Sequence, residues 1–152
     1  MSTVQESIEV EVPLHTAYNQ WTQFEDFPRF MEGVEEVTQI DARHNHWRTK
    51  VGGATREFDT EIVDQLPDER IAWRTIGGDV QQHGVVTFQQ IDGARTTVRL
   101  AMAFEPEGVA EKAADVMGMV DRRVKGDLRR FKTYIEERGF EEGGWRGRIS
   151  PS

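Results

Sequence analysis

The sequence predicts an α+β fold in which a seven-stranded, curved antiparallel sheet surrounds one long C-terminal helix, with two short helices after the first strand. The sheet is predicted by the alternation of apolar and polar residues through most of residues 34–104. The links between these segments are short and contain Gly, Asp and Pro, which is typical of turns between antiparallel neighbours. The helix is predicted by residues 109–138, where apolar residues recur at every third or fourth position and proline is absent.

The elements follow from local patterns along the chain. The first strand is expected over 4–12, where alternate residues are apolar and Pro13 ends the strand. Two short helices, each with clustered apolar side chains, are expected over 14–22 and 25–31. The remaining strands are expected over 34–41, 46–51, 56–65, 70–76, 82–91 and 96–104.

Turn residues separate these strands. Gly or Pro occurs at 52–53, 67–68, 77–79 and 92–93. The last of these, Asp-Gly, is the strongest hairpin signal because both residues tolerate positive φ.

The composition fits one domain and excludes several kinds of function. The chain has 152 residues, a formal net charge of −8 and no cysteine. This length suits a single core, and the negative charge argues against a nucleic-acid partner. The absence of cysteine excludes disulfides, thiolate zinc sites and cysteine catalysis.

We expect a cytoplasmic protein. No apolar run approaches the about 20 residues of a membrane span, so no stable membrane insertion is expected. Residues 1–11 alternate charged and apolar side chains and lack the apolar core of a signal peptide. Monomer and homodimer both remain open.

The long helix carries basic residues between its apolar positions. Acidic residues are interspersed with them at helical spacing, which predicts a salt-bridged, solvated face, and the alternative is a docking surface for an anionic partner. Gly139 suits the end of this helix. We therefore divide the chain into a domain over 1–139 and a flexible tail over 140–152, rich in Gly, Arg and Ser. The basic residues are Arg122, Arg123, Lys125, Arg129, Arg130 and Lys132.

One face of the sheet is predicted to be apolar. Even positions such as Val86, Phe88, Val98 and Leu100 are apolar, whereas their odd neighbours are polar. A strongly curved sheet cannot press its whole concave face against one straight helix. We expect the volume that side chains leave unfilled to form a cavity.

Several short motifs occur in a characteristic order along the chain. They are Val12-Pro13, Ala17-Tyr18, Trp21, Phe27-Pro28, Phe30-Met31, Glu69-Arg70-Ile71, Trp73, Gly84, Asp127-Leu128 and Phe131-Lys132. Together with the element order, these motifs resemble the START-like helix-grip superfamily, also called SRPBCC, and within it the polyketide cyclase/dehydrase and coenzyme Q-binding-like branch. The resemblance implies a helix-grip fold that binds sterols, isoprenoids, polyketides or other flat apolar molecules between the sheet and the C-terminal helix.

Aromatic, Met and Thr side chains are the predicted ligand-binding residues. Flexible Met side chains and flat rings suit an adaptable apolar pocket. The alternative is that they fill a solid core. By parity, Thr60 and Thr75 point inward, as do Arg56 and Gln90 near strand ends. The predicted set is Trp21, Phe27, Phe30, Met31, Trp47, Phe58, Thr60, Trp73, Thr75, Phe88, Met102, Met117 and Val120.

The sequence shows no catalytic set. His44 and His46 fall on one side of a strand, and two imidazoles begin a metal site, but such a site needs a third ligand. We therefore predict no metal and no cofactor. No nucleophile paired with a base and no phosphate-binding loop stands out, so no catalytic residue is predicted.

We expect a protein that binds a small hydrophobic ligand, polyketide-, isoprenoid- or lipid-like, in an internal cavity, without catalysis of its own. An alternative that the resemblance implies is a cyclase/dehydratase acting on an aromatic polyketide precursor. A further alternative is a protein-interaction module that uses the basic helix face or the tail with Trp145.

Overall fold

One antiparallel sheet organises the computed structural model, which describes residues 2–51, 53–78, 81–104, 113–141 and 143–150. Seven strands lie in the spatial order β1-β7-β6-β5-β4-β3-β2. Strands β2 to β7 therefore form a meander of neighbours, and β1 pairs with β7 at the far edge. The strands are β1 (Ser2–Val10), β2 (Val34–Gln39), β3 (His44–Val51), β4 (Ala54–Leu66), β5 (Arg70–Gly78), β6 (Gln82–Asp92) and β7 (Arg95–Phe104).

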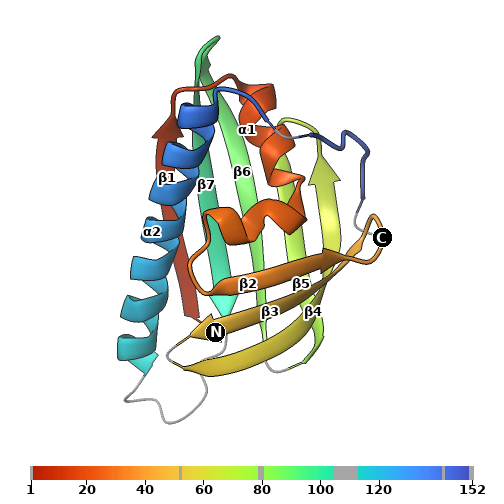
Figure 1. The fold of residues 1–152 in the computed structure, drawn as a ribbon, viewed down its shortest axis with the longest axis vertical. Coiled ribbons are helices and arrows are strands. Elements are labelled where there is room, and N and C mark those ends of the chain that lie inside the picture. The colour runs from red at the N-terminus through yellow and green to blue at the C-terminus, as the bar shows by residue number, and fades with distance from the viewer. Residues whose placement is uncertain (1, 52, 79–80, 105–112, 142, 151–152) are drawn as a thin grey trace.

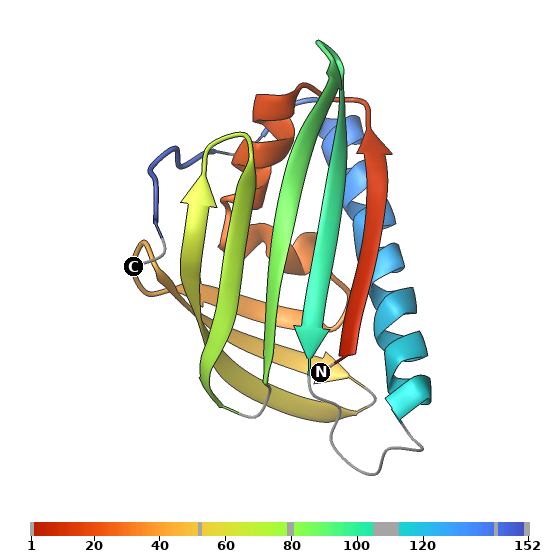
Figure 2. The same cartoon turned by 180° about the vertical axis from the view of Figure 1, so that it is seen from behind.

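The helices lie on the concave side of the sheet. The helix α1 (Leu14–Trp21) and the 3₁₀ helix η1 (Phe24–Arg29) follow β1, and α2 (Ala113–Arg138) runs beside β1 (Figure 1). Seen from behind, the long strands lie in front of the two short helices, α2 runs along the outer side of β1, and β2 to β4 curve away beneath the short helices (Figure 2). The α+β helix-grip architecture that the sequence predicts is confirmed.

Burial follows the predicted pattern on β6, β7 and α2. Val86 and Phe88 of β6 are buried, as are Val98 and Leu100 of β7, whereas Gln89 is exposed. The buried stripe of α2 packs against this apolar face. It consists of Val124, Leu128, Phe131 and Ile135.

The boundaries of the first elements differ from those predicted. β1 ends at Val10 rather than at residue 12, and the Glu11 N–H donates to the Glu136 carboxylate on α2 at 2.7 Å. The second short helix is a 3₁₀ helix over Phe24–Arg29, where the sequence predicted 25–31. The expected start of the long helix, 109–112, lies outside the described residues.

Five strands are longer than predicted: β6 and β7 by one residue each, and β3, β4 and β5 by two or three residues. β3 begins at His44 rather than at residue 46, because the Asp41 carboxylate accepts from the N–H groups of Arg43 and His44, at 2.8 and 2.9 Å, and closes the turn. β5 continues past residue 76, since Gly77 and Gly78 pair with β4. β4 extends over Ala54–Leu66 rather than 56–65 and contains a register shift between Ile62 and Asp64.

The tail, which the sequence predicts to be flexible, packs along the body of the molecule. Ile149 pairs with Gln65 of β4 through two backbone hydrogen bonds of 2.7 and 3.0 Å, and its side chain is 3% exposed. Arg146 donates to Asp68 and to Asn19, each at 2.7 Å. These contacts join the described tail residues to β4 and α1.

No described helix has the length and apolar character needed to cross a membrane.

Candidate functional site

A cavity of about 520 Å³ lies between the sheet, the two short helices and α2. Its walls are mostly aromatic and aliphatic side chains. Met119 on α2 also lines it and is 48% exposed, so the cavity reaches the surface there. The predicted residues that line it are Trp21, Phe27, Met31, Trp47, Phe58, Thr60, Trp73, Met102 and Val120.

The other predicted residues lie elsewhere. Phe30 is buried beside Phe131, with ring centroids 5.1 Å apart, and Phe88 packs edge-on against Tyr18 at 5.4 Å. Thr75 accepts a hydrogen bond from the Gln82 N–H at 3.2 Å. The structure does not place these side chains in the cavity wall. The side chain of Met117 lies outside the described part of the chain.

A stacked ring pair and its hydrogen bond form one wall. Trp47 of β3 and Phe58 of β4 are cross-strand partners, and their rings are 5.8 Å apart and within 9° of parallel. The Trp47 Nε1–H donates to the Thr60 hydroxyl at 2.9 Å. This bond fixes the orientation of the indole, so the wall is formed before any ligand arrives.

Close approach of two strands sets the position of Trp73. Trp73 of β5 is the cross-strand partner of Gly84 of β6. A Cβ atom at Gly84 would lie 2.6 Å from the Trp73 ring, so only glycine leaves room for it. The glycine that contributes to the family resemblance therefore has a local role in placing a cavity-lining ring.

Two polar atoms in the lining residues are buried without a partner. Asn45 of β3 is 1% exposed, and no described group hydrogen-bonds its Oδ1. The indole Nε1–H of Trp21 is unpartnered in the same way. Sequence reasoning missed Asn45, although its position between two outward histidines was a signal that it points inward.

Asp127 is a second residue that the sequence analysis did not assign to the cavity. It lies on α2, lines the cavity and has a side chain only 13% exposed. Its carboxylate pairs with Arg130 and accepts from the Glu32 N–H at 3.2 Å. Burial raises the pKa of Asp127 to about 6, and the Arg130 guanidinium opposes this rise.

Arg56 and Gln90, which the sequence also predicts to point inward, lie in different places. Arg56 lines the cavity, whereas Gln90 is exposed near the end of β6. The cavity lining thus contains two acidic residues, Glu32 and Asp127, and two arginines, Arg56 and Arg123, among apolar walls. Carboxylate and guanidinium groups suit proton transfer and charge stabilisation.

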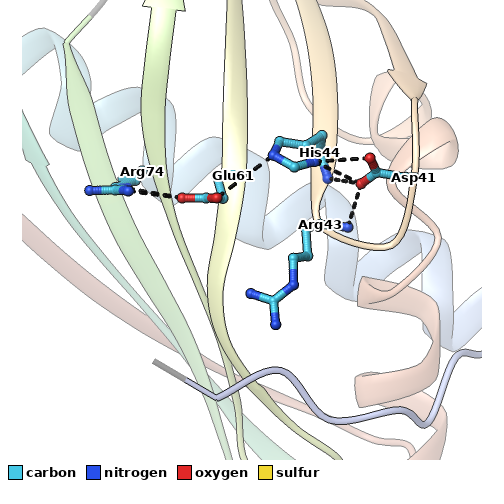
Figure 3. A network of polar contacts seen from close by, with 5 residues as sticks. All are labelled: Asp41, Arg43, His44, Glu61 and Arg74. Carbon is cyan, nitrogen blue, oxygen red and sulfur yellow. Dashed lines mark hydrogen bonds and ion pairs between the residues drawn. The ribbon is translucent and has the colours of Figure 1, made fainter. Parts of the chain in front are cut away.

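His44 and His46 share the outer face of β3. His44 Nδ1 lies 2.8 Å from Asp41, and its Nε2 lies 3.7 Å from Glu61, which in turn pairs with Arg74 at 2.9 Å (Figure 3). His46 contacts Asp59 at 2.7 Å and Glu57 at 3.1 Å, and these hydrogen bonds raise its pKa. Within the ranges that the structure describes, no group of three or more His, Asp or Glu residues has the arrangement of a metal site.

Three of the basic residues on α2, Lys125, Arg130 and Lys132, form salt bridges of the kind that the sequence predicts. Lys125 pairs with Asp121 at 3.3 Å, and Lys132 pairs with Glu136 at 2.6 Å. Arg130 pairs with Asp127 and also donates to the Phe30 carbonyl at 2.9 Å.

Known proteins share this fold and sequence. The chain is 58% identical over 149 residues to an uncharacterized 17.2 kDa protein in the melC2-rnhH intergenic region of Streptomyces lincolnensis, and the match covers 98% of this chain and 99% of the relative. The Zhui aromatase/cyclase from Streptomyces sp. R1128 superimposes with a TM-score of 0.76 at 16% identity, covering 95% of this chain and 99% of that one. A START superfamily protein from Mycobacterium smegmatis superimposes with a TM-score of 0.69 at 14% identity, covering 90% and 95%. At such identities, these two structures show the shared fold alone.

A family model assigns the chain more directly than these structures do. Residues 10–133 match the model described as "Polyketide cyclase / dehydrase and lipid transport". The match runs from the end of β1 into the last turns of α2, so it includes every element that lines the cavity. The chain therefore belongs to the polyketide cyclase/dehydrase and lipid transport family.

Proposed function

We propose that this protein binds a small hydrophobic molecule, polyketide-, isoprenoid- or lipid-like, in the cavity between the sheet and α2. The observation that carries the proposal is the cavity itself, about 520 Å³ in volume and lined mainly by aromatic and aliphatic side chains. Small-molecule pockets typically enclose about 300–1,000 Å³. A molecule in such a pocket gains about 25 cal/mol for each Å² of apolar surface removed from water.

The wall suits a flat ligand. The parallel rings of Trp47 and Phe58 present flat surfaces, and Met31 and Met102 add side chains that adapt to irregular shapes. The family's description names both polyketide chemistry and lipid transport, and both involve apolar molecules of this kind.

The test is ligand binding by the whole chain, with a variant that fills the cavity. Val120 is half-buried on α2 and lines the cavity, so Val120→Trp should occupy the volume that a ligand needs. Titration with an apolar fluorescent dye, together with native mass spectrometry of the purified protein, should detect a saturable site in the wild type. We expect affinity at least tenfold lower in Val120→Trp, because the indole and the dye compete for one space.

Arg129→Trp supplies the matched control. Arg129 is exposed on the same helix, so its replacement adds an indole without entering the cavity. Binding should stay as in the wild type. No saturable binding to the wild type, or equal binding by Val120→Trp, would contradict the proposal.

A second candidate function, cyclase/dehydratase activity on a polyketide precursor, is favoured by Asp127. A carboxylate with a pKa of about 6 in an apolar cavity is suited to taking a proton from carbon and returning it to a departing hydroxyl near neutral pH. Arg56 lines the same cavity and would stabilise the enolate that proton removal leaves. Zhui, with the same fold, is described as an aromatase/cyclase.

This second function predicts turnover that depends on Asp127. Mass spectrometry of a poly-β-ketone incubated with the protein should show cyclised and dehydrated product. Asp127→Asn should lower the rate about 100-fold or more, since general acid–base catalysis typically contributes about 10²- to 10⁴-fold. Binding without conversion by the wild type would leave the carrier function and exclude this one.

A further inference from the structure

The cavity is apolar except for a few polar groups, and two of these, on Asn45 and Trp21, have no hydrogen-bond partner among the described residues. The Oδ1 atom of Asn45 is buried and accepts no hydrogen bond from any described group. Asn45 lies on β3, which pairs with β2 on one side and β4 on the other, and it is one of the residues that line the cavity. Leaving a buried acceptor unsatisfied typically costs about 1–3 kcal/mol. A ligand that donates to Oδ1 would remove this cost, whereas a purely apolar ligand would maintain it.

We infer that the ligand is a flat, phenol-like molecule rather than a plain hydrocarbon, and that its hydroxyl group donates a hydrogen bond to Asn45 Oδ1. The inference rests on the proposed ligand-binding function and specifies the chemistry of the ligand. No described group donates a hydrogen bond to Asn45 Oδ1, so a donor on the ligand would be the partner that this atom lacks.

The neighbours of Asn45 define the surroundings of that hydroxyl. Thr60 lies directly opposite Asn45 on β4, and such cross-strand pairs place their Cβ atoms about 4.5–5.5 Å apart. The Thr60 oxygen already accepts from Trp47 Nε1, so the amide and this hydroxyl form one polar end of the cavity. The polar end is therefore fixed by β3 and β4 before binding.

The rings beside this polar end select a flat molecule. Trp47 follows Asn45 by two residues and points to the same side of β3, and its indole stacks on Phe58. An aromatic ring that extends from a hydroxyl at Asn45 would pass along this stacked pair. Aromatic pairs contribute about 0.5–1.5 kcal/mol beyond the area that they bury.

Trp21 adds a second unpartnered group of the opposite kind. Its Nε1–H is a donor, it is buried, and the residue lines the same cavity from α1. A ligand that also carries a carbonyl or ether oxygen would satisfy it.

The experiment compares three naphthalene probes by isothermal titration calorimetry on the full chain. 2-Naphthol donates a hydrogen bond, 2-methoxynaphthalene only accepts one, and 2-methylnaphthalene does neither. The wild type should bind 2-naphthol about tenfold more tightly than either of the others, which is the factor that about 1.4 kcal/mol produces. Asn45→Leu should reduce this preference to about onefold and leave binding of 2-methylnaphthalene unchanged or tighter.

Gln90→Leu is the matched control, because it replaces an exposed amide on β6 with the same side chain. It should keep the full preference for 2-naphthol. The comparison of three probes on the wild type needs no variant, so it decides the question even if Asn45→Leu does not fold.

The outcomes separate the inference from the function on which it rests. Equal binding of all three probes by the wild type overturns the hydroxyl inference and retains a hydrophobic carrier, as does a preference that survives in Asn45→Leu. Binding of none of the probes, together with failure of the dye titration, overturns the carrier function itself.

Discussion

Asp127 shows how one residue serves both the fold and the candidate site. Its carboxylate accepts from the Glu32 N–H, and its partner Arg130 donates to the Phe30 carbonyl. These bonds connect α2 to the segment between η1 and β2. The same carboxylate lines the cavity, so the charge that joins two elements is also exposed to a ligand.

The raised pKa of Asp127 predicts a pH dependence of stability. The pKa is about 6 in the folded chain against an ordinary value of 3.8 for aspartate, so the folded state holds more protons than the unfolded state between these values. Stability from this group therefore falls as the pH rises through that window. In Asp127→Asn this loss is absent. The free energy of unfolding of the variant, relative to the wild type, should increase by about 2 kcal/mol from pH 4 to pH 7.

Guanidinium denaturation of both proteins at several pH values measures this difference. Taking the variant relative to the wild type cancels the other titrating groups, among them His46, whose pKa is also raised. A difference in unfolding free energy that stays constant across the window would show that the pKa of Asp127 is unshifted. A decrease would show the opposite shift.

At the scale of elements, the tail behaves as an added edge contact. Ile149 forms an isolated antiparallel bridge with Gln65 and is not part of the seven strands, and its side chain belongs to the buried apolar core. The sequence did not predict this because residues 140–152 are rich in Gly and Arg and have no periodic apolar pattern. The buried Ile149 side chain and the hydrogen bonds of Arg146 together hold the segment against the rest of the domain.

Truncation of Ile149 should therefore destabilise the protein. Ile149→Ala removes a buried side chain that is 3% exposed and leaves a cavity, which should lower the free energy of unfolding by about 2 kcal/mol. Urea denaturation measures it, and Ile40→Ala, at a side chain 63% exposed, serves as the control with an expected change within about 0.5 kcal/mol. Equal stability of the two variants would mean that the tail does not pack in solution.

The register shift in β4 accounts for a buried residue that the alternation of the strand does not predict. Alternation from Phe58 to Ile62 points even residues inward, as predicted, but the shift after Ile62 turns Gln65 inward instead. Gln65 then donates to the Tyr18 hydroxyl at 3.1 Å, which positions α1 on the sheet. A period of two cannot reveal where an extra residue interrupts it.

For the whole molecule, curvature determines the space available to a ligand. The sheet bends so that β2 to β4 pass beneath the short helices, while α2 stays beside β1 (Figures 1 and 2). The helix fills only one side of the concave face. The aromatic residues of α1 and η1 pack against one another and against α2. The ring centroid of Trp21 lies 5.3 Å from the ring centroids of both Phe27 and Phe131. They cover the remaining side without filling it.

The sequence by itself determined the elements, their order and the apolar face of the sheet, because hydrophobic period and turn chemistry are local properties. Most of the residues that it proposed for the ligand site line the cavity. Only the tertiary structure decided that Phe30 and Phe88 belong to the packed core while Asn45 and Asp127 face the cavity. These assignments depend on sheet curvature, bulges and contacts between elements distant in sequence, and no local pattern encodes where packed surfaces stop touching.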